Sequence, residues 1–60
     1  MFKIEDIKSL DYIVGSKTLT IYFKEKRNIK NFNTDRIKLN DISIERFEKL
    51  LKEYNLSKML

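Results

Sequence analysis

The sequence predicts a small α+β domain, in which an antiparallel sheet of three or four strands carries one C-terminal amphipathic helix packed on one face. Three observations lead to this prediction: apolar and polar residues alternate over 18–23, a Gly-Ser pair lies just before them, and an apolar stripe at helical spacing occupies 44–54. Sixty residues are enough for a single domain, 1–60, with a small core.

The centre of the predicted sheet is the strand 18–24, TLTIYFK. Its residues are almost all β-branched or aromatic, the types that pack best on a pleated surface. Alternate positions are apolar, which indicates a strand with one buried face, formed by Leu19, Ile21 and Phe23. We expect the rest of the chain to cover that face.

The segment 10–14 is the predicted partner of this strand. Gly15 and Ser16 lie between the two segments and are typical of a two-residue type II′ hairpin turn, with glycine at the first central position. The register that follows places Tyr12 opposite Leu19 and gathers the apolar residues of both strands on one face, as a half-buried sheet requires.

The other predicted strand is 36–39, in which apolar and basic residues alternate. Two polar stretches, 24–28 (KEKRN) and 33–35 (NTD), have the composition of turns. Residues 2–9 fit either a short strand or a helical turn, because their apolar residues satisfy both spacings.

The helix is predicted over 44–54. Ser43 suits the N-cap position, and Ile42 before it can pack on Phe47. Asn55 suits the left-handed position that follows a helix C-terminus. The residues expected to face the sheet are spaced three or four apart: Ile44, Phe47, Leu50, Leu51 and Tyr54.

The composition excludes most catalytic and metal-binding chemistry. The chain has no His, no Cys and one Gly, so His-based triads, Cys/His zinc sites and Gly-rich phosphate loops cannot form. We therefore expect no enzyme activity, no catalytic residues, no metal and no cofactor. Because a small core without disulfides is only marginally stable, we expect a homodimer.

The N-terminal ten residues carry two acids and no long apolar run, so neither a signal peptide nor a membrane span is predicted, and we expect a cytoplasmic protein. The chain lacks Ala, Pro, Gln and Trp and is rich in Lys, Ile and Asn. AT-rich codons would give this bias, which suggests a low-GC bacterium or a phage as the source.

The net charge of +4 arises within residues 24–38, which contain six basic and two acidic residues. Such a segment can neutralise phosphates, with Tyr22 or Phe32 stacking on bases, although no helix-turn-helix, RNP or KH signature accompanies it. A solvated, soluble segment is the simpler interpretation. The candidate nucleic-acid contacts are Lys24, Lys26, Arg27, Lys30, Arg36 and Lys38.

An apolar surplus favours a different class of function. Tyrosine, methionine and aliphatic residues that exceed one small core are typical of protein interfaces, although Tyr12 and Tyr54 could instead close the rim of the core. The candidate interface residues are Tyr12, Ile13, Tyr22, Tyr54, Met59 and Leu60. The sequence thus favours a small homodimeric protein-interaction module that binds and occludes a protein partner, an inhibitor or regulator, with nucleic-acid binding as the alternative.

Overall fold

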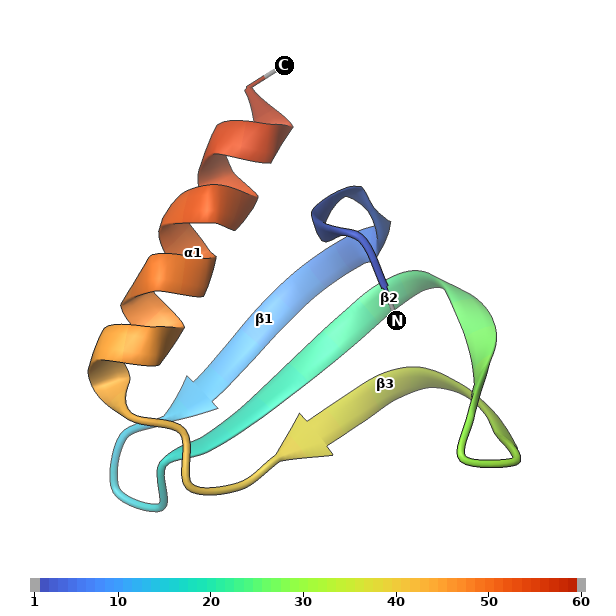
Figure 1. Ribbon diagram of the computed structural model, residues 1–60, viewed down its shortest axis with the longest axis horizontal. Helices are drawn as coiled ribbons and strands as arrows, with labels where there is room; N and C mark the ends of the chain where they lie inside the picture. The colour runs from blue at the N-terminus through green and yellow to red at the C-terminus, as the bar shows by residue number, and fades with distance from the viewer. Residues whose placement is uncertain (1, 60) are drawn as a thin grey trace.

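The predicted α+β fold is confirmed by a computed structural model, which describes residues 2–59. A three-stranded antiparallel sheet, in the order β1-β2-β3, is followed by one C-terminal helix (Figure 1). A single 3₁₀ turn precedes the sheet, in the segment 2–9 for which the sequence predicted either a short strand or a helical turn. The elements are η1 (Ile4–Asp6), β1 (Ile7–Ile13), β2 (Thr18–Ile29), β3 (Phe32–Leu39) and α1 (Ile44–Lys58).

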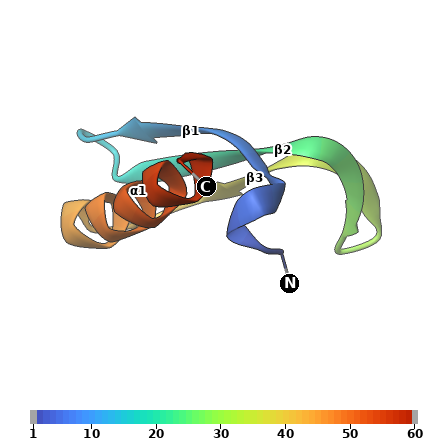
Figure 2. The same ribbon diagram turned by 90° about the horizontal axis from the view of Figure 1, so that it is seen from above.

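The molecule has two layers. Helix α1 and turn η1 lie on the same side of the sheet, and within residues 2–59 no element covers the other side (Figure 2). The end of the β2–β3 hairpin curls toward the helix side (Figure 2). The extents of 31 × 29 × 15 Å reflect this thin, one-sided arrangement.

The core lies between the sheet and the helix. The three alternating residues of β2 predicted to be buried are only 1–2% exposed, and Ile7, Ile42 and Tyr54 join them. At one end of the core the rings of Tyr12 and Phe47 stack with centroids 4.4 Å apart. At the other end Phe2 packs on Phe23 at 5.1 Å. The helix and the N-terminus therefore pack on the apolar face that β1 and β2 share.

The predicted register of the first hairpin is confirmed, with Tyr12 opposite Leu19, but its turn type is wrong. The Lys17 N–H does bond to the Val14 carbonyl at 3.3 Å, across Gly15 and Ser16. However, Gly15 does not have positive φ; Lys17 does, at 54°. A turn followed by one left-handed residue also accommodates the right-handed twist of the strands, so type II′ geometry is not needed.

Strand β1 begins at Ile7 and ends at Ile13, earlier at both ends than the predicted 10–14. The start was missed because a bulge between Ile7 and Ser9 breaks the alternation. Ile7 still pairs with Phe23 and is buried.

Both turns predicted between residues 24 and 35 are wrong. Residues 24–28 belong to β2, and 33–35 to β3. The chain reverses at Lys30-Asn31, where φ values of 48° and 70° define a type I′ turn. The polar composition of these segments reflects exposed strand positions. Between Tyr22 and Arg27 the β2–β3 register shifts, so the four residues 23–26 lie opposite Asp35 alone. Such a bulge bends a strand, which accounts for the curl of the hairpin.

The predicted start of the helix is confirmed and its predicted end is wrong. Ser43 caps α1, its hydroxyl oxygen accepting a 3.3 Å bond from the Arg46 N–H. Asn55 does not adopt the left-handed conformation; it continues the helix, which runs to Lys58. Asparagine costs only a fraction of a kcal/mol inside a helix, and good helix formers follow it. Ile44, expected in the core, is 43% exposed.

The N-terminus is fixed by a small polar cluster around Asp6. Its Oδ2 atom accepts a 3.0 Å bond from the Lys3 backbone N–H and pairs with Arg27 Nη1 at 3.2 Å. The Arg27 guanidinium also lies over the Phe23 ring, 5.0 Å from its centroid. The backbone N–H of Lys3 and the Arg27 guanidinium both lower the pKa of the Asp6 carboxyl from its ordinary value of 3.8. The cluster thus joins η1 to the bulged part of β2.

Replacing Lys30 by Asn together with Asn31 by Gly is expected to raise the free energy of unfolding by about 1 kcal/mol, because Asn-Gly is the preferred pair for a type I′ turn and relieves a left-handed lysine. Urea denaturation measures the change. Lys30→Val should lower the stability instead, because a β-branched side chain is crowded at positive φ. Equal or greater stability of Lys30→Val would contradict this interpretation of the turn.

The Asp6 cluster also predicts acid sensitivity. Because the folded pKa of Asp6 lies below its unfolded value, its contribution is complete above about pH 4 and is lost as the pH falls through the folded pKa. Thermal unfolding followed by circular dichroism from about pH 6 to about pH 2 should show a smaller loss of Tm for Asp6→Asn than for the wild type. Asp11→Asn is the control, since Asp11 forms no ion pair within residues 2–59. An unchanged acid dependence in Asp6→Asn would refute the assignment.

Candidate interaction surfaces

Two of the predicted interface tyrosines belong to the core. Tyr54 is 9% exposed, and its hydroxyl donates a 2.6 Å hydrogen bond to the Lys8 carbonyl in β1. The half-buried Tyr12 donates a 2.6 Å bond to the Ile42 carbonyl, just before α1. The two bonds attach the helix to the sheet near both of its ends. Of the two roles that the sequence left open for these tyrosines, the structure places them in closing the core.

Ile13 and Tyr22 lie on the opposite side of the sheet from α1. The register pairs Ile13 with Thr18 and Tyr22 with Arg36, and alternation turns these residues away from the core. We define the uncovered face as this side of the sheet. Ile13 is 53% exposed and Tyr22 is half-buried. The uncovered face comprises Ser9, Asp11 and Ile13 of β1, Thr18, Thr20 and Tyr22 of β2, and Arg36 and Lys38 of β3, and of these Thr18 is buried.

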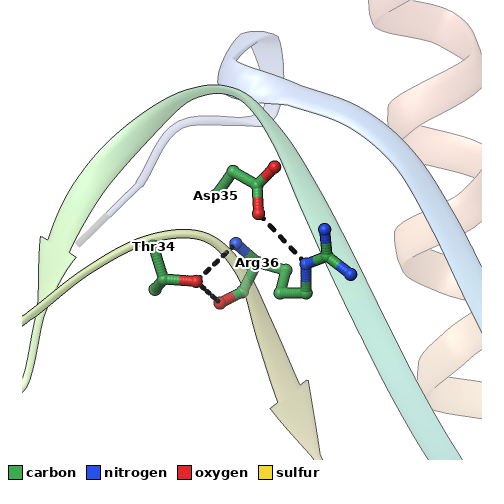
Figure 3. Close-up of polar contacts among 3 residues, drawn as sticks. All are labelled: Thr34, Asp35 and Arg36. Carbon is green, nitrogen blue, oxygen red and sulfur yellow. Dashed lines mark hydrogen bonds and ion pairs between the residues drawn. The ribbon is translucent and has the colours of Figure 1, made fainter.

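Arg36 is held in place over the Tyr22 ring. Its guanidinium carbon lies 4.8 Å from the ring centroid, and its Nε donates a 3.0 Å bond to Asp35 Oδ1 (Figure 3). The Arg36 backbone is fixed as well, since its N–H donates to the Thr34 hydroxyl at 3.3 Å and its carbonyl accepts from that hydroxyl at 3.3 Å. The side chain therefore extends from β3 across β2 as an ordered cation.

The Asp35–Arg36 pair keeps both groups charged. The hydrogen bond from Arg36 lowers the pKa of the Asp35 carboxyl below 3.8, and the bond to Asp35 raises the pKa of Arg36. Both side chains are largely exposed, so the pair orients the guanidinium more than it stabilises the fold.

The six candidate nucleic-acid contacts do not form one patch. Arg36 and Lys38 share the uncovered face, next to Tyr22 and Thr20. Arg27 is bound to Asp6 and lies on Phe23. The other three are exposed: Lys24 and Lys26 in the bulge of β2, and Lys30 in the hairpin turn. Phe32, the second candidate for base stacking, is 73% exposed beside that turn.

Lys24 also contributes to a basic cavity of about 440 Å³ between the C-terminal end of α1 and the start of β1. Its cationic lining comes from three elements, with Lys8 of β1 and Lys58 of α1 joining Lys24, and Glu5 beside them. Lys58 Nζ lies 5.1 Å from the Tyr54 ring centroid. The sequence did not reveal this cavity, because its residues are far apart along the chain.

A second surface that sequence reasoning missed lies on α1. Because the helix runs to Lys58, exposed apolar residues lie on or directly after it, outside the stripe that faces the sheet. Ile44 is 43% exposed, Leu56 55% and Met59, which caps the helix, 81%. Met59 is thus the predicted interface residue on the helix side, whereas Leu60 lies outside the described residues. A predicted helix that continued beyond Tyr54 would have placed Leu56 and Met59 outside the stripe that faces the sheet.

Other site types gain no support from the described residues. Within 2–59, no three His, Cys, Asp or Glu side chains lie together in a way that could hold a metal ion. None of the helices in this range is long and apolar enough to cross a membrane. Comparison with known protein families, with curated proteins and with solved structures finds no match for this chain.

Removing either tyrosine hydroxyl is expected to loosen the helix from the sheet. Tyr54→Phe and Tyr12→Phe should each lower the free energy of unfolding by about 1–2 kcal/mol, because each leaves a carbonyl without its hydrogen bond. Tyr22→Phe is the matched control, since it removes a hydroxyl on the uncovered face and should cost less. Chemical denaturation measures all three, and an equal loss in Tyr22→Phe would argue against the assigned roles.

Proposed function

We propose that the protein is a non-enzymatic protein-interaction module of the cytoplasm, homodimeric, which acts as an inhibitor or regulator by binding and occluding a protein partner. The observation that carries the proposal is the position of Ile13 and Tyr22 on the face of the sheet that no other part of residues 2–59 covers. Half-buried strands normally turn polar residues outward, so an isoleucine and a tyrosine there are available for contact.

Two residues of the uncovered face, Tyr22 and Arg36, are of types that interfaces favour. Tyrosine and arginine are enriched at the centres of protein interfaces, because each combines a large contact area with hydrogen bonding. Here Arg36 is already fixed over Tyr22 by Asp35, so little side-chain freedom remains to be lost on binding. Pre-ordering of this kind strengthens binding without adding contacts.

Charge indicates the kind of partner. Arg36 and Lys38 lie along β3, and Asp11 lies on β1. A partner with an apolar contact for Ile13 and acidic groups toward β3 complements this arrangement. An open sheet face on a molecule only 15 Å thick suits occlusion, because it covers a partner's surface without needing a deep pocket.

The proposal is tested by capture from a lysate of the source cells, followed by titration of the captured protein with the purified chain. Ile13→Glu should weaken binding at least about tenfold, because it places a charge at an apolar contact. Val14→Glu is the matched control, since Val14 is 65% exposed in the adjacent turn and lies outside the uncovered face. Equal binding by Ile13→Glu and wild type, with both folded, would refute this surface.

A second candidate function, nucleic-acid binding, is favoured by one observation: Arg36 and Lys38 lie beside Tyr22 and Thr20 on an open sheet face. Open sheets with aromatic and basic residues bind single strands by stacking and by phosphate contacts. Nuclease treatment of the same lysate distinguishes the two. Capture that survives nuclease supports the protein partner, whereas binding to mixed RNA or DNA that falls steeply with salt supports this candidate.

A further inference from the structure

Helix α1 has apolar residues on two sides, and only one of these sides packs against the sheet. Of the six large hydrophobic residues exposed in residues 2–59, three lie on or directly after α1: Ile44, Leu56 and Met59. Leu51, half-buried against the core, lies about 20° from Ile44 around the helix, whereas Leu56 lies about 120° from it. An open groove of about 330 Å³ lies along the C-terminal part of the helix, lined by Glu48, Leu51, Lys52, Asn55, Leu56 and Met59.

Some of these residues form a regularly spaced row. At 100° per residue, Ile44, Glu48, Asn55 and Met59 fall within about 60° of one another around the helix, and Leu51 and Lys52 border them. We call this set the outer row of α1. Its ends are apolar and its middle contains one acid and one base, on a helix at the flank of the molecule (Figures 1 and 2).

We propose that the outer row is the homodimer interface, in which α1 packs antiparallel against α1 of a second copy. The inference rests on the homodimer included in the proposed function, but not on the partner that the uncovered face would bind. A second copy is the proposed occupant because the outer row is complementary to itself. A two-fold axis near Leu51 places the apolar Ile44 of one copy level with the apolar Met59 of the other.

Charge selects the antiparallel direction. About such an axis, Glu48 of one copy lies level with the partner's Asn55. It lies about 4.5 Å along the helix from the partner's Lys52, because each residue advances the helix by 1.5 Å. Two identical Glu48–Lys52 pairs then flank the axis. A parallel arrangement would instead place Glu48 on Glu48 and Lys52 on Lys52, which is unfavourable at an interface.

The location leaves the other surface free. Helix α1 lies on one side of the sheet, and Ile13 and Tyr22 lie on the other. Dimerisation through the outer row therefore covers Ile44 and Met59 without using the uncovered face. It also adds apolar burial to a chain whose own core is small.

The test is a charge reversal in trans, read by sedimentation equilibrium at low salt. The wild type should be dimeric between about 10 and 200 µM. Glu48→Lys and Lys52→Glu should each dimerise at least about tenfold more weakly, because each brings like charges together across the axis. An equimolar mixture of the two variants should dimerise again, because the outer row of the first variant is then wholly basic and that of the second wholly acidic.

Two further variants keep the outcome interpretable. Glu53→Lys makes the same charge change on the side of α1 away from the outer row and should remain dimeric. Met59→Asp changes the exposed apolar end and should be monomeric while folded by circular dichroism. A monomeric wild type, unaffected single variants, or a mixture no more associated than its components would overturn the inference. A monomeric wild type would also remove the homodimer from the proposed function, whereas loss of association in the variants alone would not, and partner binding by the uncovered face is tested independently by Ile13→Glu.

Discussion

The structure depends on burial of one face of β2 under α1. Leu19, Ile21 and Phe23 are almost fully buried, and each such burial contributes roughly 1.5–3 kcal/mol. A helix of this length is marginal in water by itself, so it exists because it docks. The hydroxyls of Tyr12 and Tyr54 make this docking specific, since each reaches a backbone carbonyl that would otherwise be left without a partner. Everything else is arranged around this contact.

One-sided burial has a consequence for function. Within residues 2–59 one α-helix covers the sheet, so the second face of the sheet stays open there. The same limit applies to the helix, which has too few neighbours to bury a row on both of its sides. Exposed large hydrophobic residues therefore remain on the uncovered face, at Ile13, and on the helix, at Ile44, Leu56 and Met59, while Val14 and Phe32 lie at the hairpin turns. In a larger domain further elements would cover both.

The sequence predicted what short-range patterns encode. Alternation on two adjacent segments determined the Tyr12–Leu19 register, and the side chain of Ser43 determined the helix start. Prediction failed where the same residue types are compatible with two local structures. Polar residues in 24–28 are common to loops and to exposed strands, and the Lys30-Asn31 turn lacks the glycine that usually marks type I′ geometry. Asn55 predicts a helix end because asparagine strongly prefers caps, yet its cost inside a helix is small enough for the helix to continue.

The candidate surfaces, like the fold, could be predicted only where a short-range pattern determines them. Alternation was enough to place Ile13 and Tyr22 away from the helix, as the register shows. The roles of Tyr12 and Tyr54 could not be deduced, because their acceptors lie 30 and 46 residues away along the chain. The ordering of Arg36 by Asp35 likewise requires the side chains to be seen in place.

The two surfaces gain from being on opposite sides of the molecule. If α1 joins two copies, each dimer presents two uncovered faces, neither of which takes part in the joining contact. A partner that is itself a dimer or a repeat could then be held at two points, and the second contact would form at a high effective concentration. Occlusion by a chain with so little surface would thereby be strengthened without enlarging either contact. In such a dimer, α1 determines how many uncovered faces can bind the partner, and the residues of the sheet determine which partner is bound.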